Sequence, residues 1–299
     1  MKKSVSMLLA ALMLTGALAG CGSSASTSDS QAEDGADSGV SGAITVISRE
    51  DGSGTRGAFI ELTGVEEKTA DGKKVDNTTA DAEIANKTDV VLTSVAGNEK
   101  AIGYISLGAL NDTVKAVKVD GAEATVDNVK AGAYKLSRPF NIATKGEPTG
   151  VAKDFINFIL SKEGQAVVTD NKYIAVNDAA ESFVSDGSSG QIAVGGSSSV
   201  SPVMEKLIEA YKSVNPNASI DLQTSDSTSG MTGAMDGTFA IGMASRELKD
   251  EEAAQLTGTA IALDGIAVIV NPANTIDELS MDQIKSIYVG DITDWGDLA

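Results

Sequence analysis

Three times in this chain, a short apolar run is followed by a loop rich in glycine and hydroxyl residues and then by a stretch with helical periodicity. The apolar runs are 43–47, 191–194 and 220–224, and the loops that follow them are 49–55, 195–202 and 225–230. One such loop is typical of an ordinary turn. Three strand–loop–helix units together predict an α/β protein with layered sheets.

The first loop, residues 49–55, has the composition of an anion-binding turn. Its backbone N–H groups and the hydroxyls of Ser53 and Thr55 converge where the next helix begins, and a helix N-terminus favours negative charge. Arg49 adds a planar guanidinium that suits a tetrahedral oxyanion, and Asp51 is near enough in sequence to pair with Arg49 and fix its direction. We expect this loop to form one wall of a site for a small oxyanion.

The first twenty residues are typical of a secretory leader. Lys2 and Lys3 precede an apolar stretch, 5–18, that is too short for a retained membrane span. The ending Leu-Ala-Gly-Cys at 18–21 resembles a bacterial lipoprotein box, which predicts cleavage after residue 20 and lipidation of Cys21. The alternative is an ordinary signal peptide followed by an incidental cysteine.

The composition of the rest of the chain excludes several kinds of chemistry. Histidine is absent and Cys21 is the only cysteine, so disulfides, Ser–His–Asp and Cys–His catalysis and histidine-based zinc sites are unavailable. We therefore expect no catalytic residue, no metal and no cofactor. The formal net charge of −19 becomes −21 once Lys2 and Lys3 leave with the leader, which argues against nucleic acid as a partner. An anion site here must work through short-range hydrogen bonds and local dipoles.

Composition also divides the chain into segments. Residues 21–42 are small, hydroxylated or acidic and predict a disordered tether, and 185–190 resembles a linker between two blocks. Helices are predicted at 149–160, at 202–214 with Ser201 as the cap, and after the capping box that begins at Ser280. Separate strands are predicted at 260–263 and 266–270, and we assign the methionines at 231, 235 and 243 to packing.

The motifs of the two blocks resemble those of one protein family. The second block carries Gly-Ser-Ser-Ser at 196–199, Ile-Gly-Met-Ala-Ser-Arg-Glu-Leu at 241–248, and the segments 262–272 and 284–295. The first block carries Ser-Arg-Glu-Asp-Gly-Ser-Gly-Thr at 48–55 and the segments 101–105, 136–139 and 155–165. Together they make the chain similar to a phosphate-binding substrate-binding protein of an ABC transporter, the PstS type. The resemblance covers nearly all of 43–299, but the two halves stand in reversed order.

We interpret the reversed order as a circular permutation, with a fragment of two tandem copies or a gene-model error as the alternatives. The family's fold implies a two-lobed, periplasmic-binding-protein-like type II structure with the ligand in the cleft between the lobes. One lobe would contain 43–138 and 265–299, and the other would be continuous over 139–264. The family's usual ends would be joined through 185–190, and the new ends would lie between Trp295 and Ile44.

The resemblance also implies which residues bind the ligand. Arg49 would supply charge, with Asp51 in support, and the phosphate contacts would come from Arg49, Ser53, Gly54, Thr55, Ser198, Ser199, Ser227 and Ser245. Ser245 stands where the family often has an aspartate. A carboxylate accepts a phosphate proton and repels sulfate, whereas a serine hydroxyl accepts or donates, so we expect reduced selectivity against sulfate.

The implied function is that of a lipid-anchored, monomeric receptor on the extracytoplasmic face of a bacterial cell membrane. It would close its lobes on inorganic phosphate and deliver it to the permease subunits of an ABC importer. Alternatives are a receptor for sulfate, molybdate or a phosphonate, and a sensor or adhesin of the same fold. An extracellular phosphatase or other hydrolase is disfavoured, since the chain offers no histidine and no dense carboxylate cluster.

Overall fold

The structure is a computed structural model that describes residues 40–71 and 73–298. The predicted leader, Cys21 and most of the predicted tether lie outside the described residues. The backbone N–H of Val40 donates to Thr275 Oγ1 (2.7 Å), and that of Gly42 donates to Asp294 Oδ1 (2.9 Å). The last three residues of the predicted tether therefore belong to the folded part.

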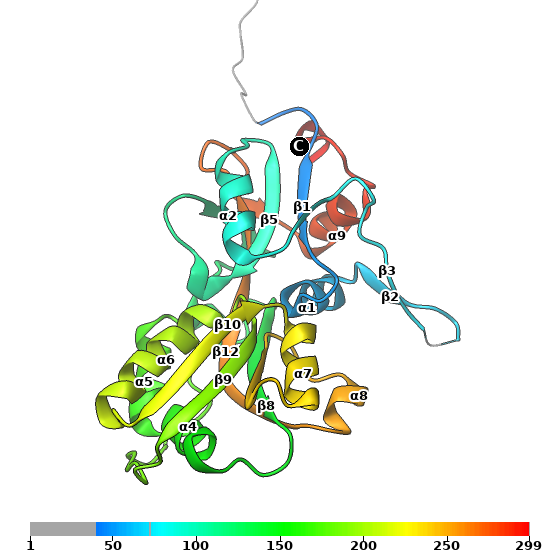
Figure 1. The fold of residues 1–299 in the computed structure, drawn as a ribbon. Coiled ribbons are helices and arrows are strands. Elements are labelled where there is room, and N and C mark those ends of the chain that lie inside the picture. The colour runs from blue at the N-terminus through cyan, green and yellow to red at the C-terminus, as the bar shows by residue number, and fades with distance from the viewer. Residues whose placement is uncertain (1–39, 72, 299) are drawn as a thin grey trace, which may run out of the picture. The chain divides into compact units, whose positions relative to one another are not determined.

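The described residues alternate strands with helices, which confirms the α/β prediction (Figure 1). The strands are β1 Thr45–Arg49, β2 Glu66–Lys68, β3 Lys74–Asp76, β4 Glu83–Ala85, β5 Ala101–Ser106, β6 Lys115–Ala116, β7 Lys118–Val119, β8 Ser137–Thr144, β9 Gly190–Ser197, β10 Ala218–Ser225, β11 Ile241–Ala244, β12 Thr257–Val270 and β13 Glu278–Leu279. The α-helices are α1 Gly54–Thr63, α2 Thr88–Ala96, α3 Val126–Lys130, α4 Gly150–Leu160, α5 Lys162–Asp170, α6 Ser201–Val214, α7 Ser227–Asp236, α8 Asp250–Ala253 and α9 Met281–Val289, and short 3-10 turns occupy Leu107–Ala109 and Trp295–Leu298.

One sheet runs through the fold in the order β10-β9-β11-β8-β12-β5-β1-β4, with β6 added beside β12. Strands β10, β9 and β11 are parallel to one another, as are β5, β1 and β4. The antiparallel pair β8 and β12 joins these two parallel groups. The carboxyl ends of β1 and β9 lead directly into the loops of the first two predicted units.

The prediction of two separate strands at 260–263 and 266–270 is wrong, because a single strand, β12, spans Thr257–Val270. Asp264 and Gly265 looked like a break in the apolar pattern. They are instead paired with Arg138 and Ser137 of β8, so the ladder continues through a polar pair. A register shift between Ala260 and Ala262 is the irregularity that the strand does contain.

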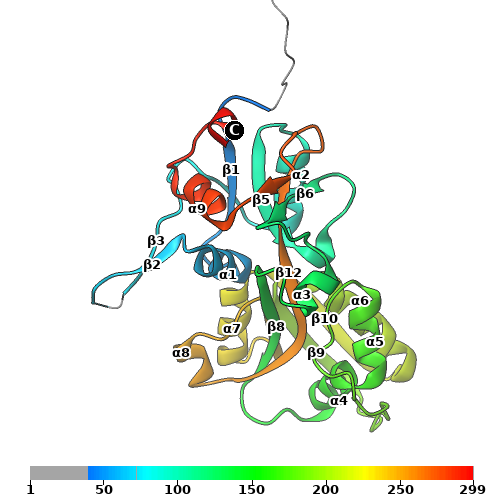
Figure 2. The same ribbon diagram turned by 180° about the vertical axis from the view of Figure 1, so that it is seen from behind.

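Two large hydrophobic cores lie along this sheet, and a third, smaller one packs Met231 and Ala234 of α7 against Ala244 of β11. Strand β12 contributes residues to both large cores, and its course can be followed in Figures 1 and 2. The first core packs α1, α2 and α9 against β1 and β5, with Phe59 stacked on Tyr104 at 4.0 Å. The second core packs α4, α5 and α6 against β8 and β9, around Phe155 and Tyr211. The assignment of lobes to 43–138 plus 265–299 and to 139–264 stays a prediction.

Four helices begin beside the sheet and position the candidate site. Ser53 caps α1 by accepting the N–H of Arg56 at 3.3 Å, and Asp226 caps α7 by accepting the N–H of Ser229 at 2.8 Å. The third predicted loop is therefore shorter than expected, since α7 already begins at Ser227. Ser201 is the first residue of α6 and not its cap, because its hydroxyl contacts Thr224 Oγ1 and Ser197 O.

Candidate functional site

Seven buried hydroxyl groups gather where elements of the two cores meet. We call them the hydroxyl cluster; its members are Thr55, Thr88, Ser197, Ser198, Ser199, Ser227 and Ser245. Each is at most 7% exposed. Buried hydroxyls are normally hydrogen-bonded, and these bond largely to one another, so the cluster is a concentrated set of polar groups enclosed by the fold.

The N-termini of four helices converge on this cluster. Thr55 lies in the first turn of α1, and Thr88 and Ser227 are the first residues of α2 and α7. Ser198 and Ser199 lie just before α6. The first N–H groups of a helix have no acceptor inside the helix, and the helix dipole places partial positive charge there. Four such ends pointing at one place favour an anion.

Hydrogen bonds within the cluster join residues that are far apart in the sequence. Thr55 Oγ1 lies 2.8 Å from Ser199 Oγ and 3.4 Å from Ser245 Oγ. Thr88 Oγ1 lies 3.4 Å from Ser199 Oγ, and Ser197 donates to Ser245 Oγ at 3.0 Å. Because a hydroxyl rotates and both donates and accepts, these bonds can be exchanged for bonds to a guest oxyanion.

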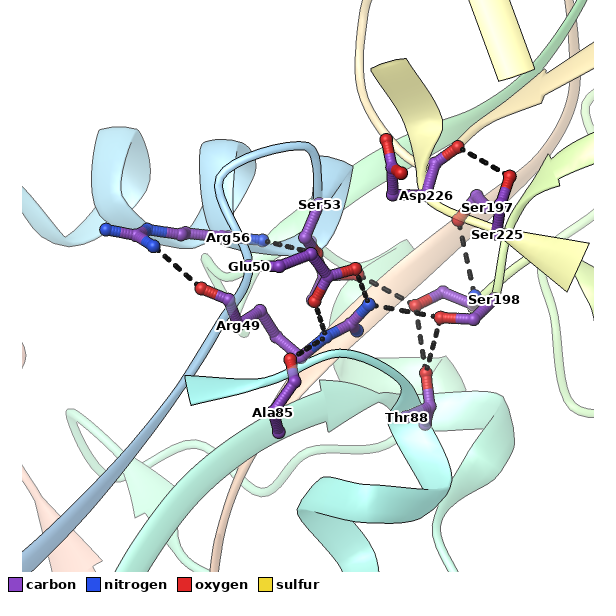
Figure 3. Close-up of polar contacts among 12 residues, drawn as sticks. Arg49, Glu50, Ser53, Arg56, Ala85, Thr88, Ser197, Ser198, Ser225 and Asp226 are labelled. Carbon is purple, nitrogen blue, oxygen red and sulfur yellow. Dashed lines mark hydrogen bonds and ion pairs between the residues drawn. The ribbon is translucent and has the colours of Figure 1, made fainter. Parts of the chain in front are cut away.

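Arg49 brings a permanent positive charge to the edge of the cluster. It is the last residue of β1 and is 2% exposed. Its Nη2 donates to Ser198 Oγ at 3.1 Å, and its Nε donates to the carbonyl oxygen of Ala85 at 3.2 Å (Figure 3). The nitrogen Nη1 makes none of these contacts, so the guanidinium is held in one orientation while part of its donor capacity stays available.

Glu50, and not Asp51, is the carboxylate that holds Arg49. Both oxygens of Glu50 accept hydrogen bonds from Arg49, at 2.8 Å from Nε and 2.8 Å from Nη2. The turn at 51–52 directs Asp51 outward, where 97% of its side chain is exposed and pairs with Arg56 Nη1 at 2.8 Å. The expected pair between Asp51 and Arg49 is therefore wrong. Asp51 reaches Arg49 only through Arg56, which donates to the Arg49 carbonyl oxygen at 2.7 Å.

Two glycines in the first loop allow the close approach of α7. A Cβ on Gly54 would overlap Ser227 Oγ and would lie 2.9 Å from Ser245 Oγ. A Cβ on Gly52 would overlap the carboxylate of Asp226. The backbone N–H of Thr228 donates to the Gly52 carbonyl oxygen at 3.2 Å. A side chain at either position would require Asp226 or Ser227 to move.

A second buried arginine, Arg138, contacts the cluster from β8. Its Nη2 donates to Thr55 Oγ1 at 3.1 Å and lies 3.2 Å from Asp264 Oδ2. Both side chains are almost fully buried, at 2% and 0% exposed. Burial raises the pKa of the Asp264 carboxyl to about 6, and the neighbouring Arg138 opposes that rise. Arg138 also lines a cavity of about 640 Å³ between α1 and the segment 246–251.

Most of the residues predicted from the sequence lie together. Arg49, Gly54, Thr55, Ser198, Ser199, Ser227 and Ser245 meet at or beside the cluster. Ser53 is also buried, but its hydroxyl serves as the cap of α1. Sequence reasoning missed Thr88, Glu50 and Arg138. Thr88 begins a helix without a glycine-rich loop, and Arg138 lies within a strand, so neither carries the signal that marked the other residues.

Residues 40–71 and 73–298 contain no group of three or more Asp, Glu, Cys or His side chains placed to hold a metal ion. Over the same residues, every helix is too short or too polar to cross a membrane.

Comparison with known proteins places the chain among binding proteins of transporters. A family model described as a PBP superfamily domain matches residues 24–163 and 182–299. The chain is 50% identical over 300 residues to the phosphate-binding protein PstS 2 of Streptococcus agalactiae serotype V, covering 99% of this chain and 98% of that protein. Its identity to the phosphate-binding protein PstS 2 of Streptococcus pneumoniae serotype 4 is 48% over 296 residues, which covers 99% of each.

A solved structure of a phosphate-binding protein is also similar to this chain. The crystal structure of a phosphate-binding protein of a phosphate ABC transporter from Streptococcus pneumoniae superposes with a TM-score of 0.69 at 50% sequence identity. The match covers 86% of this chain and 100% of that one. The α/β architecture described above is therefore that of a solved binding protein.

Proposed function

Because the chain belongs to the PBP superfamily and, within it, to the PstS family of phosphate-binding proteins, we propose that it binds inorganic phosphate at the hydroxyl cluster. The observation that carries this proposal is the convergence of seven buried hydroxyls and four helix N-termini beside the buried guanidinium of Arg49. This arrangement supplies donors and positive potential to a small tetrahedral anion without a metal.

Phosphate would replace the hydrogen bonds that the hydroxyls now make with one another. Thr55 and Ser199, which are 2.8 Å apart, would separate and donate to different phosphate oxygens. Arg49 would donate through its available nitrogen while Glu50 keeps the guanidinium plane fixed. Since Thr55 comes from α1 of the first core and Ser199 from the second, the anion would join elements of both cores. Binding would thereby favour the conformation in which the two cores approach each other.

Ser245 makes another oxyanion the second candidate ligand. The seven cluster members are all hydroxyls, and Ser245 itself accepts a hydrogen bond from Ser197 at 3.0 Å. None of these groups repels a fully deprotonated anion as a carboxylate would. Sulfate or molybdate therefore satisfies the same donors as phosphate, and discrimination between phosphate and sulfate is expected to be weak.

The remainder of the proposal concerns the protein's setting. After cleavage of 1–20, lipids on Cys21 would anchor a monomer at the outer face of the cell membrane, where it passes phosphate to the permease of an ABC importer. We assign it no catalytic activity. Steady phosphate release from model esters by the purified protein would instead support the alternative of a hydrolase. A sensor or adhesin would bind no small anion, or would bind one without closing its lobes.

Titration calorimetry tests the proposal directly. The chain beginning at Gly22, stripped of bound anion, would be titrated with phosphate and then with sulfate. One-to-one binding of phosphate supports the proposal, and comparable binding of sulfate identifies a broader oxyanion receptor. If the folded protein binds neither anion, the site does not have the proposed function.

A further inference from the structure

Arg138 has polar atoms that the fold leaves without partners. Within residues 40–71 and 73–298, the buried side-chain atoms that lack a hydrogen-bond partner are Ser106 Oγ, Arg138 Nε, Arg138 Nη1, Tyr173 Oη and Asp264 Oδ2. Arg138 is thus a buried cation with two of its three nitrogens unused. Among the residues that the structure describes, its one side-chain hydrogen bond runs from Nη2 to Thr55.

Packing alone does not account for this arrangement. Asp264 is the direct cross-strand partner of Arg138, between β12 and β8, and its Oδ2 lies 3.2 Å from Nη2 without hydrogen-bond alignment. The ring of Phe140 lies on another side of the guanidinium, with its centroid 5.5 Å from Cζ. Unpaired donors in a buried charged group are costly to folding. Their retention points to a partner that arrives from outside the chain.

The position of Arg138 identifies that partner. Through Thr55 Oγ1 the guanidinium bonds to a member of the hydroxyl cluster, and Arg138 is also one of the residues that line the cavity beside α1. Arg49 reaches the same cluster through Ser198, so two guanidinium groups lie at the cluster on different elements. Two cations suit an oxyanion that carries up to two negative charges, because each can donate to a different oxygen.

We infer that Arg138 is a second anion-binding arginine, which donates directly to the bound oxyanion and is held in place by Asp264. The inference rests on the proposed function, because it assigns a further contact within the same site. Arg138 binds the anion, whereas Asp264 is a positioning residue that balances the buried charge while the site is unoccupied. Since an arginine donates equally to phosphate and to sulfate, it strengthens binding of both.

The test removes the pair without leaving an unpaired buried charge. Arg138→Gln alone would strand the Asp264 carboxylate, so the main variant is the double replacement Arg138→Gln with Asp264→Asn. The matched control is Lys249→Gln, which removes an exposed cation that lines the same cavity but contacts none of the cluster. Circular dichroism and the thermal midpoint without ligand establish that each variant is folded.

We expect the double variant to bind phosphate at least about tenfold more weakly than the wild type, from the loss of charge-assisted hydrogen bonds. Sulfate binding should fall by a similar factor, and Lys249→Gln should bind phosphate within about threefold of the wild type. A folded double variant whose phosphate affinity stays within twofold of the wild type overturns the inference. Failure of the wild type itself to bind phosphate would instead overturn the proposed function, so the two failures are distinguishable.

Discussion

Replacing Glu50 with glutamine is expected to destabilise the ligand-free protein far more than replacing Asp51 with asparagine. Glu50 accepts two hydrogen bonds of 2.8 Å from Arg49, which is 2% exposed. Asp51 has a side chain that is 97% exposed, and it pairs with Arg56. The two carboxylates are adjacent in the sequence, so each variant is the control for the other.

The magnitudes follow from burial. Removing one partner of a buried ion pair costs about 3 to 5 kcal/mol, because the other charge is left uncompensated. The Glu50 side chain is 21% exposed, and glutamine keeps one carbonyl acceptor, so we expect a loss of about 2 kcal/mol for Glu50→Gln. Arg56 keeps a second partner, Asp76, when Asp51 is replaced. Asp51→Asn should therefore cost no more than about 0.5 kcal/mol.

Urea unfolding followed by circular dichroism measures both variants. The buffer must contain no phosphate or sulfate, because a bound anion stabilises the folded state and would hide the difference. An unchanged denaturant slope shows that the variants differ in stability alone. The thermal midpoint of Glu50→Gln should fall by about 4 to 8 °C. Equal losses for the two variants, or a larger loss for Asp51→Asn, would refute the assignment of Glu50 as the partner of Arg49.

Three further predictions follow from the site. Gly54→Ala should weaken phosphate binding in calorimetry by about tenfold or more, because its Cβ would overlap Ser227 Oγ. The control is Gly57→Ala, in which the new Cβ meets nothing closer than 3.8 Å. This control should bind phosphate as the wild type does and gain about 0.5 to 1 kcal/mol of stability. Thr88→Val should weaken phosphate binding by about tenfold at unchanged fold, whereas Thr93→Val, on the exposed side of the same helix, should bind as the wild type does. In the folded protein the pKa of the Asp264 carboxyl is about 6, above the ordinary 3.8. Protonation of Asp264 therefore contributes its full share to the free energy of unfolding below about pH 4, and this contribution is lost as the pH rises through 6. Relative to the variant that lacks Arg138 and Asp264, the unfolding free energy of the wild type should fall by about 2.4 kcal/mol between pH 4 and pH 7.5, and a flat difference over that range would contradict the raised pKa.

The sequence predicted those parts of the site that local backbone geometry encodes. In a strand–loop–helix unit, the loop residues lie at the N-terminus of the helix that follows, independently of contacts with the rest of the fold. Thr55 was predicted for this reason, whereas the resemblance to the family implied Ser199 and Ser227. The direction of the side chains within the loop was not encoded in the same way. Whether Glu50 or Asp51 meets Arg49 depends on the turn at 51–52 and on the competing cation Arg56.

Contacts between residues far apart in the sequence could not be predicted from local sequence patterns. The two strands predicted at 260–263 and 266–270 leave out Asp264, a charged residue that interrupts the apolar run. Only the register of β12 on β8 places it opposite Arg138 and makes a buried pair possible. Thr88 was missed because α2 begins without any glycine, and its proximity to Ser199 arises from a pairing across 111 residues. Pairings of this kind are set by topology, which no local pattern contains.

The predicted circular permutation would leave the contacts of the candidate site intact. Residues on either side of the inferred junction lie side by side: Ile44 N donates to Thr293 O at 2.8 Å, and Trp295 N donates to Gly42 O at 3.1 Å. This junction is at the start of β1, whereas Arg49 is at its end, about 13 Å farther along a strand. Opening the chain here removes none of the contacts of Arg49 or the hydroxyl cluster. The relatives in Streptococcus align with the chain from end to end, so they share this order of segments. The predicted permutation would therefore place its junction and the proposed ligand site at opposite ends of the same strand, β1.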